Sequence, residues 1–150
     1  MLIDHWPLLG LKLTTPRLEL RLPTGDELAA LAELAARGVH RPGETPFLTP
    51  WTDLPPAQRA RDVVQGHWGD CGDWKPEDWS LGLVVFEDRK PLGVQNMRAR
   101  DFPVLREVAS SSWLGLDHHG RGIGTEMRQR QMSFVDNPCL ELFGVKGLKG

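Results

Sequence analysis

The sequence predicts one α+β domain in which a mostly antiparallel sheet is flanked by helices. Two observations support this fold class. Apolar residues recur at the period of a strand in some segments and at the period of a helix in others. These segments follow one another in the order strand, helix, helix, strand, strand, strand, helix, instead of the strict strand-helix alternation typical of parallel sheets. The chain has 150 residues, of which 40% are hydrophobic and 25% charged, enough for a single domain with a core.

The first strand and the first long helix have the clearest patterns. "RLELRL", residues 17–22, alternates leucine with charged residues, as a half-buried strand does. "TGDELAALAELAARG", residues 24–38, begins with Thr24 and has Glu27 three residues later, which is the spacing of a capping box. Its leucines share one helical face, so we expect a helix that ends near Gly38.

The rest of the chain predicts a second helix, a hairpin and a further strand. Residues 39–56 carry five prolines and no sustained period, which indicates a long loop. "PPAQRARDVVQGHW" predicts a helix that begins at Pro55 or Pro56. Strand-like runs flank "EDRK", a candidate hairpin turn, and a third run leads into a glycine-rich turn and a last helix. The three runs are residues 79–86, 92–98 and 107–114.

Composition argues against several classes of protein. The formal charge of −2 and the pI near 6.2 give no global attraction to nucleic acid or to anionic membranes, and we expect neither as a partner. Cys71 and Cys139 are too few for a disulfide framework and lack a metal-binding spacing. The N-terminus lacks the charged start of a signal peptide, and no apolar run is long enough to span a bilayer. We therefore expect a cytoplasmic protein.

The glycine-rich turn lies in "LGLDHHGRGIGTEM", residues 114–127. A nucleotide P-loop is a poor match, because Arg121 and Gly122 stand where the lysine and the hydroxyl residue belong. A dinucleotide-binding fingerprint is also poor, because Thr125 replaces its third glycine. The shorter pattern G-x-G-x-G before a helix fits better, since successive backbone N–H groups and the helix dipole can bind a pyrophosphate. Arg121 would add a cation at its rim.

The same segment resembles a known family. "SWLGLDHHGRGIGTEMR" is similar to the acyl-CoA-binding segment of GNAT N-acetyltransferases, whose signature is Q/R-x-x-G-x-G/A; here His119 stands at its first position. Upstream, "LTTPRLELRLPTGDELAAL" resembles the first strand and helix of the branch related to ribosomal-protein alanine acetyltransferases. The resemblance covers residues 11–130 and implies a GNAT-type fold, with a mixed, mostly antiparallel central sheet.

The resemblance implies a substrate and a set of site residues. Acetyl-CoA would be the acyl donor, with its pantetheine arm along the strand before the turn and its pyrophosphate on the turn. A backbone N–H near Leu114 would stabilise the oxyanion, and Glu107 is the candidate general base by its position on the strand. The chain has no tyrosine to protonate the leaving thiolate. The implied acetyl-CoA-binding residues are Trp113, Leu114, Gly115, Leu116, His119, Gly120, Arg121, Gly122, Ile123, Gly124 and Thr125.

The C-terminal part departs from the family pattern. After Gly124 the family pattern needs about 55 more residues, estimated from ordinary element lengths, and 26 follow here. The helical period fades at Arg130 and Gln131, and Asn137-Pro138 predicts a stop. We expect a truncated or frameshifted member, diverging at about residue 129, that lacks the last strand-helix-strand elements and has a divergent tail over 131–150. A missing strand would leave the edge of the strand at residues 107–114 uncovered. Uncovered edges favour association, so a homodimer is a further expectation.

Two functions stay open at this stage. The first is transfer of an acetyl group from acetyl-CoA to a primary amine, on a protein N-terminus or a small molecule, by direct attack in a ternary complex. The second is an inactive acyl-CoA-binding or interaction module, or a non-functional fragment. His118 and His119 diverge on a turn, so no metal site is expected. A group of aromatic and acidic residues forms either a pocket for a cationic amine or ordinary packing: Trp51, Trp68, Trp74, Trp79, Asp53, Asp70, Asp73, Glu77 and Asp78.

Overall fold

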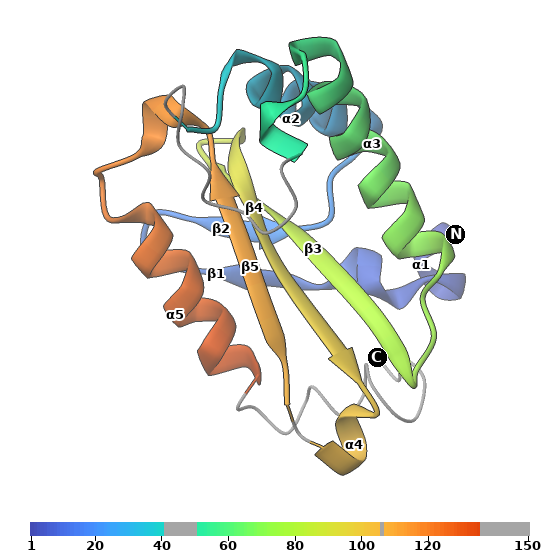
Figure 1. Ribbon diagram of the computed structural model, residues 1–150. Helices are drawn as coiled ribbons and strands as arrows, with labels where there is room; N and C mark the ends of the chain where they lie inside the picture. The colour runs from blue at the N-terminus through green and yellow to red at the C-terminus, as the bar shows by residue number, and fades with distance from the viewer. Residues whose placement is uncertain (41–50, 106, 136–150) are drawn as a thin grey trace.

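One antiparallel sheet forms the centre of the molecule (Figure 1). The computed structural model describes residues 1–40, 51–105 and 107–135. Within them the strand order follows the chain, β1-β2-β3-β4-β5, and every neighbouring pair is antiparallel. The predicted α+β class is confirmed. The strands are β1 (Lys12–Thr14), β2 (Glu19–Arg21), β3 (Asp78–Glu87), β4 (Lys90–Arg100) and β5 (Ala109–Leu114).

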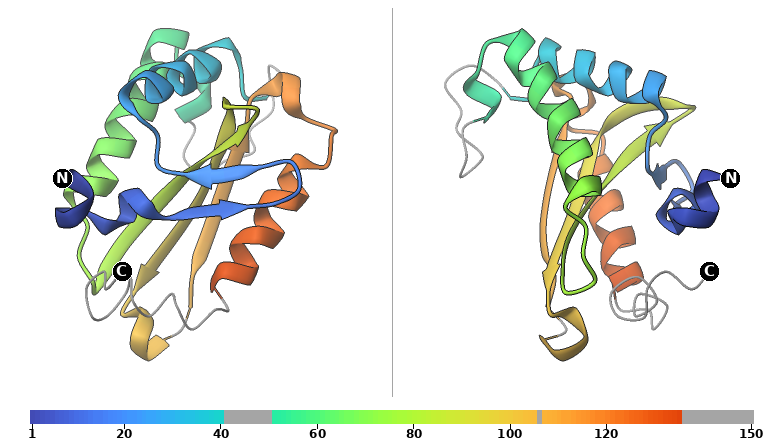
Figure 2. Two further views of the ribbon diagram at one scale, coloured as in Figure 1. Left: turned by 180° about the vertical axis from the view of Figure 1, so that it is seen from behind. Right: turned by 90° about the vertical axis from the view of Figure 1, so that its right-hand side faces the viewer.

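Helices cover both faces of this sheet (Figure 2). Helices α2 and α3 pack together on one face, and α5 lies on the other. The N-terminal segment, which the sequence patterns did not predict, adds a short helix and a 3-10 turn. The helices are α1 (Leu2–His5), α2 (Gly25–Arg37), α3 (Pro56–Gly72), α4 (Phe102–Leu105) and α5 (Ile123–Val135), and the 3-10 turns are η1 (Pro7–Gly10), η2 (Trp51–Asp53) and η3 (Leu116–His118).

The predicted capping box begins α2. The Thr24 hydroxyl accepts a hydrogen bond from the Glu27 backbone N–H, and the Glu27 carboxylate accepts one from the Thr24 N–H at 2.8 Å. The same carboxylate accepts a bond from Arg21 Nη1 at 2.7 Å, which joins β2 to the start of α2. The Arg21 guanidinium lies 4.1 Å above the Phe86 ring centroid, so this corner also includes a cation–π contact.

The predicted hairpin is present and longer than expected. Strands β3 and β4 pair from Asp78↔Arg100 to Glu87↔Lys90. Asp88 and Arg89, which connect them, have φ values of 50° and 66°. Two consecutive positive φ values give the type I′ turn, whose twist matches that of the flanking strands.

The central strand β3 divides the interior into two apolar clusters. Leu83 and Val85 belong to the cluster that also contains Ile123 and Met127 of α5. The intervening Val84, with Phe86, packs on the side of α2 and α3. Since successive side chains of a strand point to opposite faces, a run that is buried on both faces appears as a continuous apolar stretch.

Helix α5 keeps a buried face through its last turn, which differs from the sequence-based expectation. Gln131 is 2% exposed, and its side-chain oxygen accepts a hydrogen bond from the buried amide of Gln95 on β4. Phe134, one turn later, is buried too. The apolar helical period fades at Gln131 in the sequence because this residue is polar. A sequence does not distinguish a buried polar residue that has a polar partner from an exposed one. The predicted stop at Asn137-Pro138 and most of the predicted tail lie outside the described residues.

Candidate functional site

The glycine-rich turn connects β5 to α5, and two backbone hydrogen bonds fix the end that follows β5. Gly115 donates its N–H to the carbonyl of Leu92 at 2.8 Å, and Leu116 donates to that of Gly38 at 3.0 Å. Gly120 and Gly122 have φ values of +77° and +76°. This left-handed region is costly for residues with a Cβ, so the turn needs glycine at both positions.

The turn presents backbone donors at the start of α5. Among the residues that the structure describes, no acceptor lies opposite the N–H groups of residues 120–125; the next one, that of Glu126, bonds to the Gly122 carbonyl at 3.1 Å. Successive unpaired N–H groups together with the positive end of a 13-residue helix form a binding site for an anionic phosphate group. The residues present therefore fit the pyrophosphate of a coenzyme A.

An ion pair from the β1–β2 connection fixes the position of the turn. Arg17 Nε lies 2.9 Å from Glu126 Oε1, and Arg17 Nη1 donates to the Arg121 carbonyl at 3.0 Å. The Thr15 hydroxyl donates to the other oxygen of Glu126, and these partners lower the pKa of that carboxyl, Thr15 most of all. No local sequence pattern predicts this contact, because more than 100 residues separate its partners.

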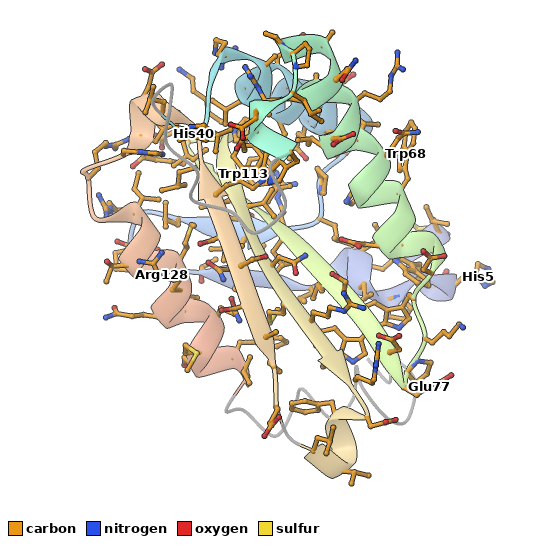
Figure 3. All side chains as sticks on the ribbon, in the orientation of Figure 1. His5, His40, Trp68, Glu77, Trp113 and Arg128 are labelled. Carbon is orange, nitrogen blue, oxygen red and sulfur yellow. The ribbon has the colours of Figure 1, made fainter. Side chains whose placement is uncertain are left out.

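Two further arginines lie near the turn. Arg121, expected as a free cation at its rim, instead forms an ion pair with Glu87 at 2.8 Å, so a carboxylate balances its charge. Arg128 Nη1 lies 3.3 Å from the point where a Cβ at Gly124 would stand. Helical side chains lean toward the N-terminus, which brings this exposed guanidinium to the first turn of α5 (Figure 3).

The two adjacent histidines have separate environments. His119, the unusual first residue of the turn signature, lies with Nε2 3.0 Å from the carbonyl oxygen of Leu114. Burial, followed by the charge of Arg121, lowers the pKa of His118. In the parts of the chain that the structure describes, no three histidine, cysteine or acidic side chains gather in a way that could hold a metal ion.

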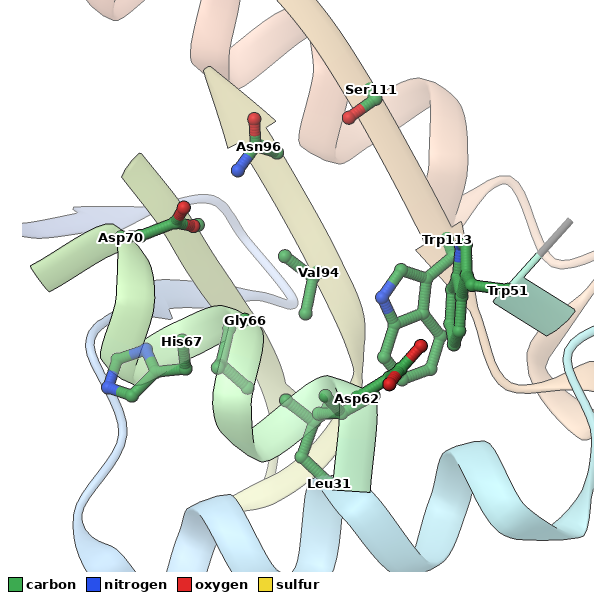
Figure 4. Close-up of a pocket in the computed structure, with 13 residues that line it drawn as sticks. Leu31, Trp51, Asp62, Gly66, His67, Asp70, Val94, Asn96, Ser111 and Trp113 are labelled. Atoms are coloured by element: carbon green, nitrogen blue, oxygen red, sulfur yellow. The ribbon is translucent and has the colours of Figure 1, made fainter. Parts of the chain in front are cut away.

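A pocket of about 300 Å³ lies between α3 and the face of strands β3, β4 and β5 (Figure 4). Its aromatic end consists of Trp51 and Trp113, whose rings meet edge to face at 5.6 Å. Its polar groups include carboxylates from α3. The lining residues are Leu31, Trp51, Asp62, Val63, Gly66, His67, Asp70, Gly82, Val84, Val94, Asn96, Ser111 and Trp113.

The charged side chains that line this pocket are acidic. Burial raises the pKa of the Asp70 carboxyl, opposed by a hydrogen bond from Ser80 and by the charge of Arg98. Burial lowers the pKa of His67, which favours its neutral form at neutral pH. No lysine or arginine lines the pocket within the described residues. An environment with carboxylates, aromatic rings and no fixed cation favours a positively charged ligand.

The comparisons with known proteins agree with this geometry. The family model of the acetyltransferase (GNAT) domain matches residues 17–146. The chain belongs to the GNAT acetyltransferase family. The family uses acyl-CoA, which suits the donors of the turn, and the recognition made from the turn signature is confirmed.

Several solved GNAT structures share the fold at low sequence identity. The acetyltransferase that modifies the N-terminal serine of ribosomal protein L7/L12 from Salmonella typhimurium is 16% identical, with a TM-score of 0.57; the match covers 80% of this chain and 64% of that one. RimJ of Mycobacterium smegmatis, in complex with a CoA-disulfide, is 14% identical with a TM-score of 0.60, covering 83% and 60%. MccE, a microcin C7 self-immunity acetyltransferase in complex with acetyl-CoA and AMP, is 15% identical with a TM-score of 0.55, covering 81% and 64%. The chain thus spans about two thirds of the length of such structures.

The structure separates the residues expected to bind acetyl-CoA from the expected base. Trp113 and Leu114 end β5 and are half-buried beside the turn, so the predicted binding residues form one continuous segment. Glu107 is exposed and precedes the start of β5. Seven residues of nearly extended chain separate it from Leu114, about 20 Å at the rise of a strand. Glu107 therefore lies at the other end of β5 and does not line the pocket.

The predicted aromatic and acidic group divides between the pocket and the core. Trp51 and Asp70 line the pocket. Trp74 and Trp79 instead stack on each other at 5.2 Å in the core, and Trp68 is 64% exposed. The sequence interpretation omitted Trp113, Asn96 and Asp62 from this pocket, because they come from three different elements that only the folded chain brings together.

No helix within the described residues is long and apolar enough to cross a membrane.

Proposed function

We propose that this GNAT domain transfers an acetyl group from acetyl-CoA to a primary amine. The observation that carries the proposal is the row of unpaired N–H groups at residues 120–125, which directly follows the strand whose Trp113 forms a wall of the pocket. A site for an anionic donor and a site for a cationic acceptor thereby adjoin at the end of β5. Bringing two substrates together in this way accounts for much of the rate of such a reaction.

Acetyl-CoA supplies an acetyl thioester that an amine nitrogen can attack. In our proposal the N–H groups of residues 120–125 bind its pyrophosphate, and the edge of β5 from Trp113 onward lies along its pantetheine arm. Within the described residues β5 pairs with β4 alone, so its outer edge has backbone groups available for such pairing. The N–H of Leu114 is our candidate donor to the thioester oxygen as that atom gains negative charge.

The proton of the attacking ammonium needs an acceptor, and the leaving sulfur needs a donor. Glu107 stays our predicted acceptor; because about 20 Å of nearly extended chain separates it from Leu114, it would receive the proton only through a chain of several water molecules. The chain has no tyrosine. Of the serine run at residues 110–112, Ser111 lines the pocket, so Ser111 or water is our candidate donor to the thiolate.

Two measurements test the proposal. Calorimetric titration with acetyl-CoA is expected to show binding to the folded protein, and release of free thiol with a panel of primary amines is expected to depend on the amine. No binding by a sample with a cooperative unfolding transition would refute the acetyl-CoA site. Binding without thiol release from any amine would instead support the binding-only function, which the lack of tyrosine favours. In the same assay Glu107→Gln should lower kcat and leave the affinity for acetyl-CoA unchanged.

A further inference from the structure

The carboxylates of the pocket stand at its two ends. Asp62, Gly66 and Asp70 line it from α3 at intervals of four residues. At 1.5 Å per residue, the two aspartates begin about 12 Å apart along the helix axis. Gly66 between them has no side chain to narrow the space. The helix therefore contributes two negative charges separated by a gap.

A small space beside Asp70 has the size of one ammonium group. A Cβ built at Gly82 would meet Val94 Cγ1 at 3.4 Å, Asn96 Nδ2 at 3.5 Å and Asp70 Oδ2 at 3.9 Å. These are ordinary contact distances, so a group as large as a methyl fits there with a carboxylate oxygen on one side. Figure 4 shows the Asp70 and Asn96 side chains on the same side of the strands. Asp70 forms no ion pair within the described part of the chain, although Ser80 donates a hydrogen bond to it and Arg98 acts on it through its charge, so a bound cation would share the carboxylate with these two groups.

The floor between the two ends is apolar. In the strand register Gly82 pairs with Asn96 and Asn96 with Ser111, while Val84 pairs with Val94 and Val94 with Trp113. Two steps between strands separate the space over Gly82 from β5, about 10 Å in all. Val94 occupies the middle of this path, and Asp62 and Trp113 line the pocket at its far end (Figure 4). The path is suited to methylene groups between two charged ends.

We propose that the acceptor is an α,ω-diamine of four or five carbons, with one ammonium at Asp70 and the other at the Asp62 end of the pocket. The end beside Trp113 is the reacting end, because it adjoins β5, and Asp70 determines specificity by holding the nitrogen that does not react. An extended chain of that length separates its nitrogens by about 6 to 8 Å from standard bond lengths. Adding a charge-assisted hydrogen bond of about 2.8 Å at each end gives about 12 to 14 Å, close to the helical rise of about 12 Å between Asp62 and Asp70. The choice of the end that reacts rests on the proposed function, and the binding of the two ammonium groups does not.

Equilibrium binding tests the proposal without requiring turnover. Wild-type protein is titrated calorimetrically with 1,4-diaminobutane and with butylamine, which has the same apolar length and one ammonium. We expect the diamine to bind at least about tenfold more tightly, as one additional charge-assisted contact in a half-buried site would give. In a series from 1,2-diaminoethane to 1,8-diaminooctane, affinity should be highest at four or five carbons. Equal affinity for diamine and monoamine, or no dependence on length, would overturn the proposal.

Three variants test whether Asp70 holds the ammonium that does not react. Asp70→Asn should reduce the affinity for the diamine to that for butylamine, and Gly82→Ala should do the same by filling the space beside it. Asp73→Asn is the matched control, because Asp73 ends the same helix, carries the same charge and does not line this pocket. The control should bind the diamine within about twofold of wild type, as expected for an exposed charge. If Asp70→Asn and Asp73→Asn behave alike, Asp70 does not hold the ammonium.

The outcomes separate this inference from the proposed function. Binding of acetyl-CoA with acetylation of monoamines and diamines at equal efficiency would refute the diamine site and leave the acetyltransferase proposal intact. Acetylation of a peptide N-terminus with no binding of 1,4-diaminobutane would do the same. If the chain binds the diamine and does not bind acetyl-CoA, the proposed function is refuted and the diamine site is supported.

Discussion

The glycine turn follows β5, the pocket includes Trp113 near the end of that strand, and in our proposal the two bind charge by opposite means. The turn offers backbone N–H groups, and two of the three arginines near it are already neutralised, Arg17 by Glu126 and Arg121 by Glu87, while the third, Arg128, is exposed beside Gly124. The pocket offers side-chain carboxylates that have no basic partner within its lining. Binding at the turn therefore depends on backbone geometry, whereas binding in the pocket depends on uncompensated charge. Of the four changes below, two are at the turn and one is in the pocket, and Glu27 at the start of α2 gives a compensated carboxylate for comparison with Asp70.

Gly122→Val should have the largest effect. The residue has a φ of +76°, and a Cβ there would lie 3.6 Å from Arg17 Nη2, so a β-branched side chain must distort the turn. We expect acetyl-CoA to bind about 100-fold more weakly, because several N–H groups lose their common direction. Calorimetric titration measures this, and binding of 1,4-diaminobutane in the pocket should stay within twofold. Unchanged affinity for acetyl-CoA would show that the turn does not hold the phosphates.

Arg17→Met should have the next largest effect. It removes the bonds from the guanidinium to Glu126 and to the Arg121 carbonyl, which leaves the turn less restrained and Glu126 with the Thr15 hydroxyl but without its cation. We expect about tenfold weaker binding of acetyl-CoA, in the range of a charge-assisted contact. Arg61→Met, which removes one exposed charge from α3, is the control for overall charge and should change the affinity little. Equal losses in both variants would mean that Arg17 acts only through long-range attraction.

Glu27→Gln tests a carboxylate whose charge is fully compensated. Hydrogen bonds and charge from Arg21 hold the pKa of Glu27 at about 2, below its ordinary value. A depressed pKa means that the carboxylate stabilises the fold above about pH 4.5 and that this contribution is lost as the pH falls toward 2. We expect the variant to lose about 1 kcal/mol of unfolding free energy at pH 7, an amount discounted for partial exposure. Urea unfolding at several pH values measures it. A difference from wild type that stays constant down to pH 2.5 would contradict the assignment, and Glu33→Gln, exposed on the same helix, is the control.

Asp70→Asn should have the smallest effect on stability, with the opposite sign. Burial raises the pKa of Asp70, so the fold disfavours its charged form relative to the unfolded chain. The cost is present at neutral pH and disappears as the pH falls below the ordinary carboxyl value near 4. We expect the variant to be about 0.5 kcal/mol more stable than wild type at pH 7, and equal to it at pH 3.5. A variant that is less stable at pH 7 would make Asp70 a structural residue and would weaken its role as a binding group.

The turn could be predicted from the sequence and the pocket only in part, for a physical reason. Gly120 and Gly122 are required by local backbone conformation, and the Thr24 and Glu27 cap is required by local hydrogen bonding, so short windows of sequence contain the information. The pocket joins Trp51, Asp70 and Trp113 from elements that meet only through packing and strand register. Glu107 marks the same limit: the strand predicted over residues 107–114 begins at Ala109, and the sequence does not say which environment each end of a strand meets.

The hydrogen bond between Gln95 and Gln131 selects one rotation of α5 about its own axis relative to the sheet. Turning α5 by one residue would swing the Gln131 amide about 100° away from the sheet and leave that of Gln95 buried without its partner. Such an orphaned group costs about 1 to 3 kcal/mol, whereas leucines at both sites would tolerate several rotations of the helix. The direction in which the first N–H groups of α5 point is therefore decided two to three turns away, by a pair of amides that touches no substrate.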